Sequence, residues 1–357
     1  MLFLHVAFLF ANLYNVAVHT GLARMPPVTT ASQVPSSYAL GLDVGHSAVK
    51  ISTCFMRDTI KTAVCHEIQI TDEAEARRAA EETYEVPGGR GRYFVGDTAL
   101  VQGVNAGDIG LSDSWIETPE YAALMLSGFH RARRAAGGLD PRLVVMGLPA
   151  SLFARQKTTL SGLASELFPE SRILVMPQSY APYAGIKLNS HGVPDPAYAG
   201  MTSFAVVEVG YYTTDFAMII NERPVERANQ SCSGVRVAVD ALQRALSGEG
   251  VTTDASECEA ALSSGVIKHF GQQRQIGGLI KSASAQLVTE VMDAANRLFE
   301  THARRMDAVV LAGGGARLLE AGLRNKWPNL IVPEHPRYAV AEGLRRIGDA
   351  KLLRRTV

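Results

Sequence analysis

Apolar residues along the chain fall into short β-branched runs and into longer stretches with helical spacing, separated by turn-forming residues. Two regions follow one plan: residues 38–54, YALGLDVGHSAVKISTC, and residues 202–221, TSFAVVEVGYYTTDFAMIIN. In each, an apolar run is broken by a glycine and a polar segment and then resumes, which predicts two strands joined by a tight turn. We therefore expect two β-hairpins of similar design in two parts of the chain.

An alternation of helices and strands follows the first hairpin. A helix is predicted to begin at Pro119 and to stop at Gly137, because proline suits the first turn of a helix and glycine its end. The strand 142–149, a helix over 151–167 and the strand 172–177 come next. A strand, helix, strand order of this kind indicates parallel strands in an α/β sheet.

Three neighbouring segments have weaker signals. Residues 62–70, TAVCHEIQI, are predicted to continue the first sheet after a short break, and the charged run 71–85 is predicted to be a surface helix or a solvated excursion. Residues 189–200, NSHGVPDPAYAG, are rich in turn formers. We expect the chain to pass from one domain to the next there.

The second hairpin precedes a mostly helical stretch. Its elements are a helical region over about 234–300 interrupted at 263–278, a buried strand in 307–315, a helix that begins at the glycine run, a strand in 329–335 and a helix over 337–355. The whole pattern predicts a duplicated two-domain α/β fold, with domain I at 38–190 and domain II at 201–357. We expect the last helix to pack back on domain I.

Residues 1–37 precede the predicted fold. The first 20 residues are apolar, and no Lys or Arg occurs before Arg24. They lack the basic region of a secretory signal and the flanking charges of a membrane anchor. We expect that synthesis begins at Met25 and that residues 1–24 are untranslated or disordered, with a signal or an anchor as the alternative. Residues 26–37 then form a Pro/Ser/Thr linker.

Composition excludes several classes of function. The 35 basic residues balance 35 acidic ones, so no global field favours direct contact with nucleic acid or an anionic membrane. The basic clusters 131–138 and 344–355 are predicted to be solvated helix faces, with contact to DNA or acidic partners as the alternative. The 4 cysteines are widely spaced, which fits neither a zinc site nor a disulfide framework and favours a reducing cytoplasm.

Three loops could face one ligand. Residues 42–50, LDVGHSAVK, and 207–215, VEVGYYTTD, each place a carboxylate, Asp43 or Glu208, two residues before a glycine. A turn of small residues offers backbone N–H groups to an anion, and a nearby carboxylate holds the cation that accompanies a polyphosphate. The third loop, VVLAGGGARLL at 309–319, has consecutive glycines between a strand and a helix, which lets a ring or a ribose approach the backbone.

Each loop alone has an ordinary structural explanation. A hairpin turn with glycine is usually only a turn, and a strand, glycine run and helix serve packing as often as ligand binding. The order and the spacing of the three loops favour a nucleotide site. The chain has no GxxxxGK[ST] motif and no GxGxxG after its first strand, which argues against a P-loop NTPase and a Rossmann dinucleotide site.

The three loops together resemble a known superfamily. In this order, GLDVGHSAVK, VVEVGYYTTDF and VVLAGGGARLL are similar to the phosphate-one, phosphate-two and adenosine motifs of the actin, sugar kinase and heat-shock ATPase superfamily. MPQS at 176–179, followed by Ala181, and YAVAEGL at 338–344 resemble its two connecting segments. Over about residues 38–350 the chain most resembles the ParM/StbA plasmid-segregation actins. The resemblance implies an actin-like, ribonuclease H-like duplicated fold, with ATP or ADP and Mg²⁺ in a cleft between the domains.

The resemblance also implies roles for individual residues. Asp43 and Glu208 would hold the magnesium through water, and Gln178 would orient the attacking water, as a glutamine does in GTPases. Asp215 would complete the catalytic set and anchor the second hairpin. The other expected nucleotide contacts are Gly45, His46, Ser47 and Lys50 at the first turn, Gly210, Tyr211, Thr213 and Thr214 at the second, and Gly313, Gly314 and Gly315 against the adenosine.

The chain departs from the family's pattern at both turns. His46 stands where many relatives have Ser or Thr, so a hydroxyl donor is lost or is shifted to Ser47. Glu208 is one methylene longer than the usual aspartate. Tyr211 and Tyr212 replace small residues, and we expect their rings to pack against the neighbouring loop. Each departure is also compatible with a slow or silent ATPase.

The leading hypothesis for function is an ATP-hydrolysing, head-to-tail filament in the cytoplasm that moves plasmid DNA through a DNA-binding adaptor protein. One alternative is a small-molecule kinase of the same superfamily, which would need a carboxylate to accept the proton of a substrate hydroxyl. Another is a scaffold that binds ATP without hydrolysing it. The preference for ATP over GTP rests on the resemblance alone.

Overall fold

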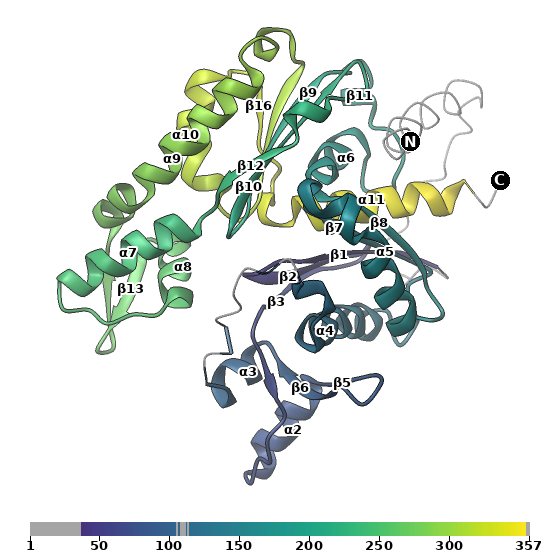
Figure 1. Ribbon diagram of the computed structural model, residues 1–357, viewed down its shortest axis with the longest axis vertical. Helices are drawn as coiled ribbons and strands as arrows, with labels where there is room; N and C mark the ends of the chain where they lie inside the picture. The colour runs from purple at the N-terminus through teal and green to yellow at the C-terminus, as the bar shows by residue number, and fades with distance from the viewer. Residues whose placement is uncertain (1–36, 105, 108–111, 113, 355–357) are drawn as a thin grey trace, which may run out of the picture.

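The computed structural model describes residues 37–104, 106–107, 112 and 114–354 (Figure 1). The predictions for residues 1–36 lie outside the described residues. Two lobes, each built on a mixed β-sheet, meet along helices α6 (Ala181–Lys187) and α11 (Ala339–Leu353). Within the described ranges, no helix has the length and apolar character needed to cross a bilayer.

The first lobe is built on a sheet with the strand order β3-β2-β1-β7-β8. β1 pairs antiparallel with β2 and parallel with β7, which pairs parallel with β8. Helices α4 and α5 pack on one face through a shared apolar core, and α11 packs on the other. The bounds are β1 (Ala39–Val44), β2 (Ala48–Ser52), β3 (Arg57–Lys61), α4 (Pro119–Ala135), β7 (Leu143–Leu148), α5 (Ala150–Leu167) and β8 (Arg172–Pro177).

The second lobe repeats this plan. Its sheet has the order β11-β10-β9-β15-β16, with β12 also paired to β10, and β9 pairs antiparallel with β10 and parallel with β15. Helices α7, α9 and α10 pack on one face, and α6 lies against the other. The bounds are β9 (Phe204–Val209), β10 (Thr213–Ile220), β11 (Arg223–Pro224), β12 (Gln230–Ser233), α7 (Arg236–Gly248), α9 (Gly277–Phe299), β15 (Ala308–Ala312), α10 (Ala316–Lys326) and β16 (Leu330–Ile331).

The two predicted hairpins, β1–β2 and β9–β10, therefore occupy equivalent places in the two sheets. The lobes are joined where α11 crosses α6, and the crossing leaves no room for a side chain at Gly343. A Cβ added at Gly343 of α11 would lie 1.8 Å from the carbonyl oxygen of Ala181 on α6. Because α11 also packs on β1 and β7, this close crossing holds the second lobe against the first lobe's sheet.

Each lobe carries a small extension. The extension of the first lobe has a separate sheet in the order β4-β6-β5 and helices α2 and α3, and the extension of the second lobe has α8 and the β13–β14 hairpin (Figure 1). The bounds are β4 (Val64–His66), α2 (Glu73–Glu81), β5 (Thr83–Val86), β6 (Gly91–Val95), α3 (Asp97–Gln102), α8 (Ala255–Ser264), β13 (Val266–His269) and β14 (Gln272–Gln275).

The prediction that residues 62–70 continue the first sheet is wrong. β4 pairs with β6 in the small sheet, where Val64 lies opposite Val95. Apolar alternation indicates that a segment is a strand, but it does not identify the strand that it pairs with. The charged run 71–85 forms α2, capped by the Asp72 side chain, and then β5. The interruption at 263–278 contains the β13–β14 hairpin.

Candidate functional site

The two hairpin turns, residues 45–47 (the first turn) and 210–212 (the second turn), border one cavity between the lobes. The cavity has a volume of about 320 Å³. Among the residues predicted for the site, those that line it are Asp43, Gly45, His46, Ser47, Lys50, Gln178, Glu208, Gly210, Tyr211, Thr213, Asp215, Gly314 and Gly315. The structure thus brings together residues from all three predicted loops and from the first connecting segment.

Thr214 and Gly313 are predicted site residues that do not line this cavity. Thr214 is fully buried, and its hydroxyl donates to the carbonyl oxygen of Ser233 at 2.9 Å. Gly313 has a φ of +93°, and an added Cβ would lie 2.3 Å from the carbonyl oxygen of Val209. Both residues shape the wall behind the second turn.

The strands that flank the first turn carry an ion pair. Asp43 at the end of β1 lies directly opposite Lys50 on β2, and the Lys50 Nζ is 3.1 Å from the Asp43 Oδ2. The turn is closed by the Gly45 amide, which donates to the carbonyl oxygen of Ala48, and the Thr62 hydroxyl donates to the carbonyl oxygen of Gly45. A fixed cation therefore lies beside backbone groups that can face an anion.

The strands that flank the second turn carry two carboxylates in the corresponding positions. Glu208 on β9 lies directly opposite Asp215 on β10, and both side chains are buried. Asp215 accepts hydrogen bonds from the hydroxyls of Thr213 and Ser231. Burial raises the pKa of Asp215, and burial together with the charges of Asp215 and Asp43 raises the pKa of Glu208 to about 8.

This carboxylate cluster fits a hydrated divalent cation. A cation between Asp43, Glu208 and Asp215 would relieve the repulsion and desolvation that hold the pKa of Glu208 high. No group of three His, Cys, Asp or Glu side chains among the described residues is arranged to hold a metal alone. Mg²⁺ usually keeps several waters and takes ligands from phosphate oxygens, so these carboxylates would share it with a bound polyphosphate.

Side chains of the two lobes touch across the cavity. The His46 ring stacks on Trp115 with ring centres 3.9 Å apart and meets the edge of Tyr212 at 4.9 Å. Burial lowers the pKa of His46 to about 4, and its Nε2 is buried without a hydrogen-bond partner. The Ser47 hydroxyl donates to the Glu259 Oε1 on α8 at 2.5 Å. The prediction that a tyrosine ring packs against the neighbouring loop is confirmed for Tyr212.

Gln178 reaches the cavity from the end of β8. It begins the single 3₁₀ turn η2 (Gln178–Tyr180), directly after the strand. A Cβ added at Gly147 on β7 would lie 2.8 Å from the Gln178 Cβ, so the glycine makes room for the glutamine. An amide can orient a water molecule by hydrogen bonds but cannot remove its proton.

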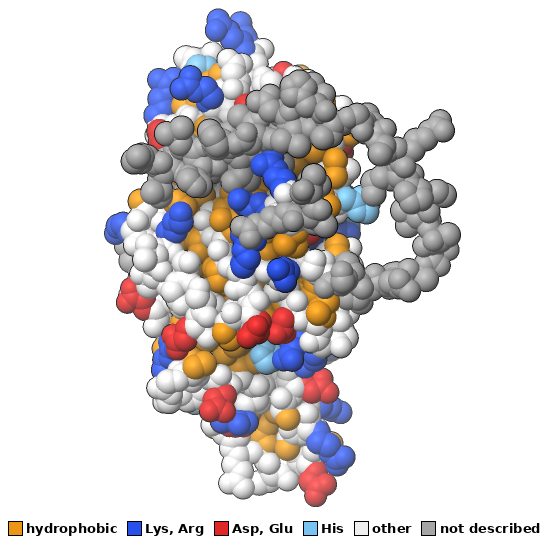
Figure 2. Space-filling view, turned by 90° about the vertical axis from the view of Figure 1, so that its right-hand side faces the viewer, with side chains coloured by type: hydrophobic (Ala, Val, Ile, Leu, Met, Phe, Trp, Pro, Cys, Tyr) orange, Lys and Arg blue, Asp and Glu red, His pale blue; other side chains and the backbone are white. Residues whose placement is uncertain are grey.

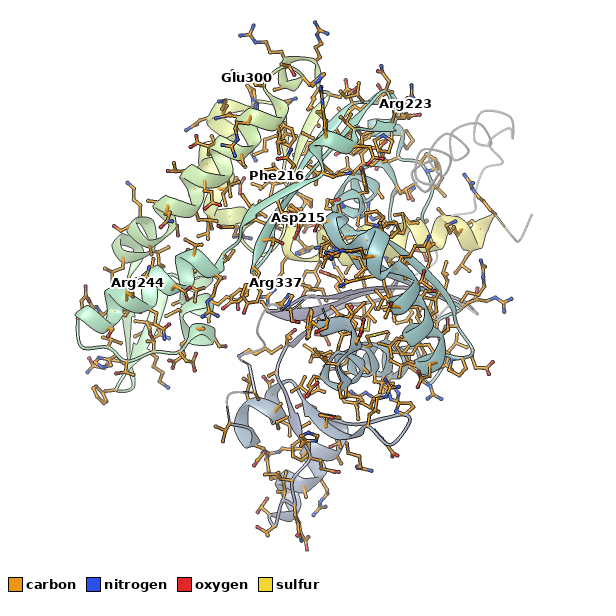
Figure 3. All side chains as sticks on the ribbon, in the orientation of Figure 1. Asp215, Phe216, Arg223, Arg244, Glu300 and Arg337 are labelled. Atoms are coloured by element: carbon orange, nitrogen blue, oxygen red, sulfur yellow. The ribbon has the colours of Figure 1, made fainter. Side chains whose placement is uncertain are left out.

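Several cavity residues were not identified by the sequence motifs. They are Trp115 in the turn η1 (Trp115–Glu117), Tyr121 on α4, Glu259 on α8, Arg317 on α10 and Arg337 in the turn η6 (Pro336–Tyr338). Figure 3 labels Asp215 and Arg337 in the middle of the molecule, where the lobes meet. Two of them had a local signal: Arg317 lies inside the third loop, 309–319, and Arg337 directly precedes the connecting segment 338–344.

Comparison with known families agrees with this architecture. Residues 41–168 match the N-terminal domain of actin-like proteins, and residues 206–325 match the C-terminal domain of the archaeal actin homologue MreB-like family. The chain belongs to the actin-like proteins. The resemblance seen in the sequence motifs is therefore confirmed.

Solved structures share the fold of this actin-like chain at low sequence identity. A ParM from a 15-stranded filament of Clostridium botulinum has a TM-score of 0.68 and 18% identity, over 87% of this chain and 99% of that chain. An archaeal actin homologue has a TM-score of 0.66 and 19% identity, over 87% of this chain and 99% of that chain. Bacillus thuringiensis ParM with ATP has a TM-score of 0.60 and 13% identity, over 90% of this chain and 100% of that chain. A search of curated protein sequences found no significant match.

Proposed function

We propose that this actin-like chain binds ATP or ADP with Mg²⁺ between its lobes, hydrolyses ATP and assembles into filaments whose stability depends on the bound nucleotide. The observation that carries the proposal is that both turns border one cavity, with a lysine beside the first turn and paired buried carboxylates beside the second. The lysine would favour an anion and the carboxylates a cation, as a magnesium-bound polyphosphate requires.

Residues of both lobes would take part in binding and in hydrolysis. Lys50 would contact the phosphate chain, and Asp43 and Glu208 would hold the magnesium through water. Gln178 would orient the attacking water opposite the second turn. Of the glycine run, Gly314 and Gly315 line the cavity and would lie against the adenosine.

The proposed partners are further copies of the chain and a DNA-binding adaptor. Related ParM proteins include one seen in a 15-stranded filament. The formal net charge of 0 at pH 7 supports contact with DNA through an adaptor rather than directly. Acidic and basic side chains both occur on the face drawn in Figure 2. We place this activity in the cytoplasm, in segregation of plasmid DNA.

Sedimentation and light scattering of the purified chain with Mg²⁺ and ATP test the proposal. We expect nucleotide-dependent pelleting. Gln178→Ala should lower ATP turnover by about tenfold or more, an effect of about 1.4 kcal/mol on the barrier, and its polymers should persist longer. Gln102→Ala, on α3 outside the cavity, is the matched control and should behave as the wild type.

Two outcomes would contradict the proposal. ATP binding without pelleting at any concentration would leave a kinase or a scaffold. Pelleting with equal turnover in the wild type and in Gln178→Ala would show that another group orients the water.

A further inference from the structure

The tip of the β13–β14 hairpin carries the most exposed large apolar side chain among the described residues. Phe270 is 94% exposed. It lies in a two-residue turn with Gly271, because His269 pairs with Gln272 on the opposite strand. Figure 1 shows this hairpin at the far end of the second lobe, beside α7 and α8.

The turn conformation does not favour a phenylalanine. Phe270 has a φ of +48° and Gly271 a φ of +81°, so both central residues of the turn are in the left-handed region. This is the type I′ hairpin turn, in which Asn or Asp before Gly is strongly preferred and a bulky residue is strained. Within the chain the ring contacts the neighbouring His269, with ring centres 4.4 Å apart. A polar residue would suit both the backbone and the exposure better.

The hairpin presents this ring from a firmly held base. Ile267 on β13 and Ile276 just after β14 are buried in the core of the second lobe. The side chains around the tip on β14 include the exposed amides of Gln272 and Gln273. Lys268 on β13, opposite Gln273, is exposed as well. An exposed aromatic residue on a rigid support is typical of an anchor in a protein interface.

We propose that Phe270 inserts into the surface of a second copy of this chain, as a head-to-tail contact in the filament. The inference rests on the proposed function. The hairpin lies at one end of the second lobe, and β11 and the end of α9 lie at the other, where Figure 3 labels Arg223 and Glu300. Stacking copies along this direction brings the two ends together, and such a contact does not close on itself.

The charge of the chain favours a second copy over a strongly charged partner. The formal net charge is 0 at pH 7, so copies do not repel one another as a whole. Beside the tip, the amides of Gln272 and Gln273 are uncharged and Lys268 carries one positive charge. A hairpin tip buries only a small area, so Phe270 would be one anchor within a larger contact.

Phe270→Asn tests the inference, because it removes the ring and places a better residue in the turn. We expect the critical concentration for ATP-dependent pelleting to rise at least tenfold, while nucleotide binding and Tm stay the same or Tm rises. Phe270→Tyr should assemble nearly as the wild type does. Val101→Ser, which removes another exposed apolar side chain from α3 in the first lobe, is the matched control and should leave assembly unchanged.

The outcomes separate this inference from the proposed function. If the wild type pellets and Phe270→Asn pellets at the same critical concentration, the inference fails while the filament remains. If the wild type does not pellet, the proposed function fails and the inference fails with it. A marked fall in Tm for Phe270→Asn would show that the ring serves the fold instead.

A photo-crosslinking amino acid in place of Phe270 gives a second measurement. With ATP, we expect a product of twice the chain mass in which position 270 is joined to a peptide from the β11 and α9 end of the second lobe. Crosslinks confined to the same chain, or formed only with a different protein, would overturn the assignment.

Discussion

The first and second turns occupy equivalent places in their sheets but differ in charge. In the first, Asp43 lies opposite Lys50, and the pair is neutral as a whole. In the second, Glu208 lies opposite Asp215, and both carboxyls have raised pKa values because they are buried together. The same backbone plan therefore places a lysine that favours an anion on one side of the cavity and two carboxylates that favour a cation on the other.

The two turns also differ in how they are held. The first turn is closed within its own hairpin and by the segment after β3, where the Thr62 hydroxyl donates to the Gly45 carbonyl oxygen, and Ser47 also contacts Glu259. The second is held by distant segments: the Gly234 amide donates to Tyr212, and the Gly315 amide donates to Val209. We infer that the position of the second turn depends on the glycine run at 313–315, and that the first turn does not.

Gly313→Ala tests this dependence and should have the largest effect. The added Cβ would lie 2.3 Å from the Val209 carbonyl oxygen, at a φ of +93° that disfavours alanine. We expect the free energy of unfolding to fall by about 2–4 kcal/mol, measured by urea denaturation. At Gly314 an added Cβ meets nothing within 4 Å, so Gly314→Ala should change the free energy of unfolding by less than about 0.5 kcal/mol. Equal effects of the two substitutions would contradict the argument.

The charge difference predicts a pH dependence of the nucleotide-free chain. The pKa of Glu208 rises from 4.5 to about 8 on folding, so between these values the folded state binds more protons than the unfolded state. The free energy of unfolding therefore falls as pH rises from about 5 to 8, by up to about 1.4 kcal/mol per pH unit.

Glu208→Gln should flatten this slope, because the amide does not ionise. The measurement is urea unfolding at several pH values in EDTA without nucleotide, and Glu73→Gln on the exposed start of α2 is the control. Magnesium with ATP should also flatten the slope in the wild type. A slope that is unchanged in Glu208→Gln would show that other groups cause it.

The sequence predicted the duplicated fold and both turns because their signals are local. An apolar run, a glycine, polar residues and a second apolar run identify a hairpin wherever it lies. The alternation of β10 also contained information that the motif did not use. Successive side chains of a strand point to opposite faces, so Thr213 and Asp215 share the cavity side while Thr214 faces away.

The parts that could not be predicted depend on tertiary contacts. β4 has the composition of a strand, but its pairing with β6 is decided by packing in the small sheet. Trp115 and Glu259 reach the cavity from a 3₁₀ turn and from a helix more than 40 residues beyond the second turn, and neither has a pattern that marks a ligand site. Such residues are found only once the lobes are placed against each other.

The contact between Ser47 and Glu259 links the first turn to the second lobe, and its removal should have the smallest effect. The hydroxyl donates to a half-buried carboxylate at 2.5 Å, and a bound phosphate would compete for that hydroxyl and repel the carboxylate. We expect Glu259→Gln to bind ATP about threefold more tightly and Ser47→Ala about threefold more weakly, each about 0.6 kcal/mol, by calorimetric titration. In a double-mutant cycle, Ser47→Ala should remove most of the gain from Glu259→Gln. Additive effects would mean that the carboxylate acts on the nucleotide without Ser47, and the first turn would then be independent of the second lobe.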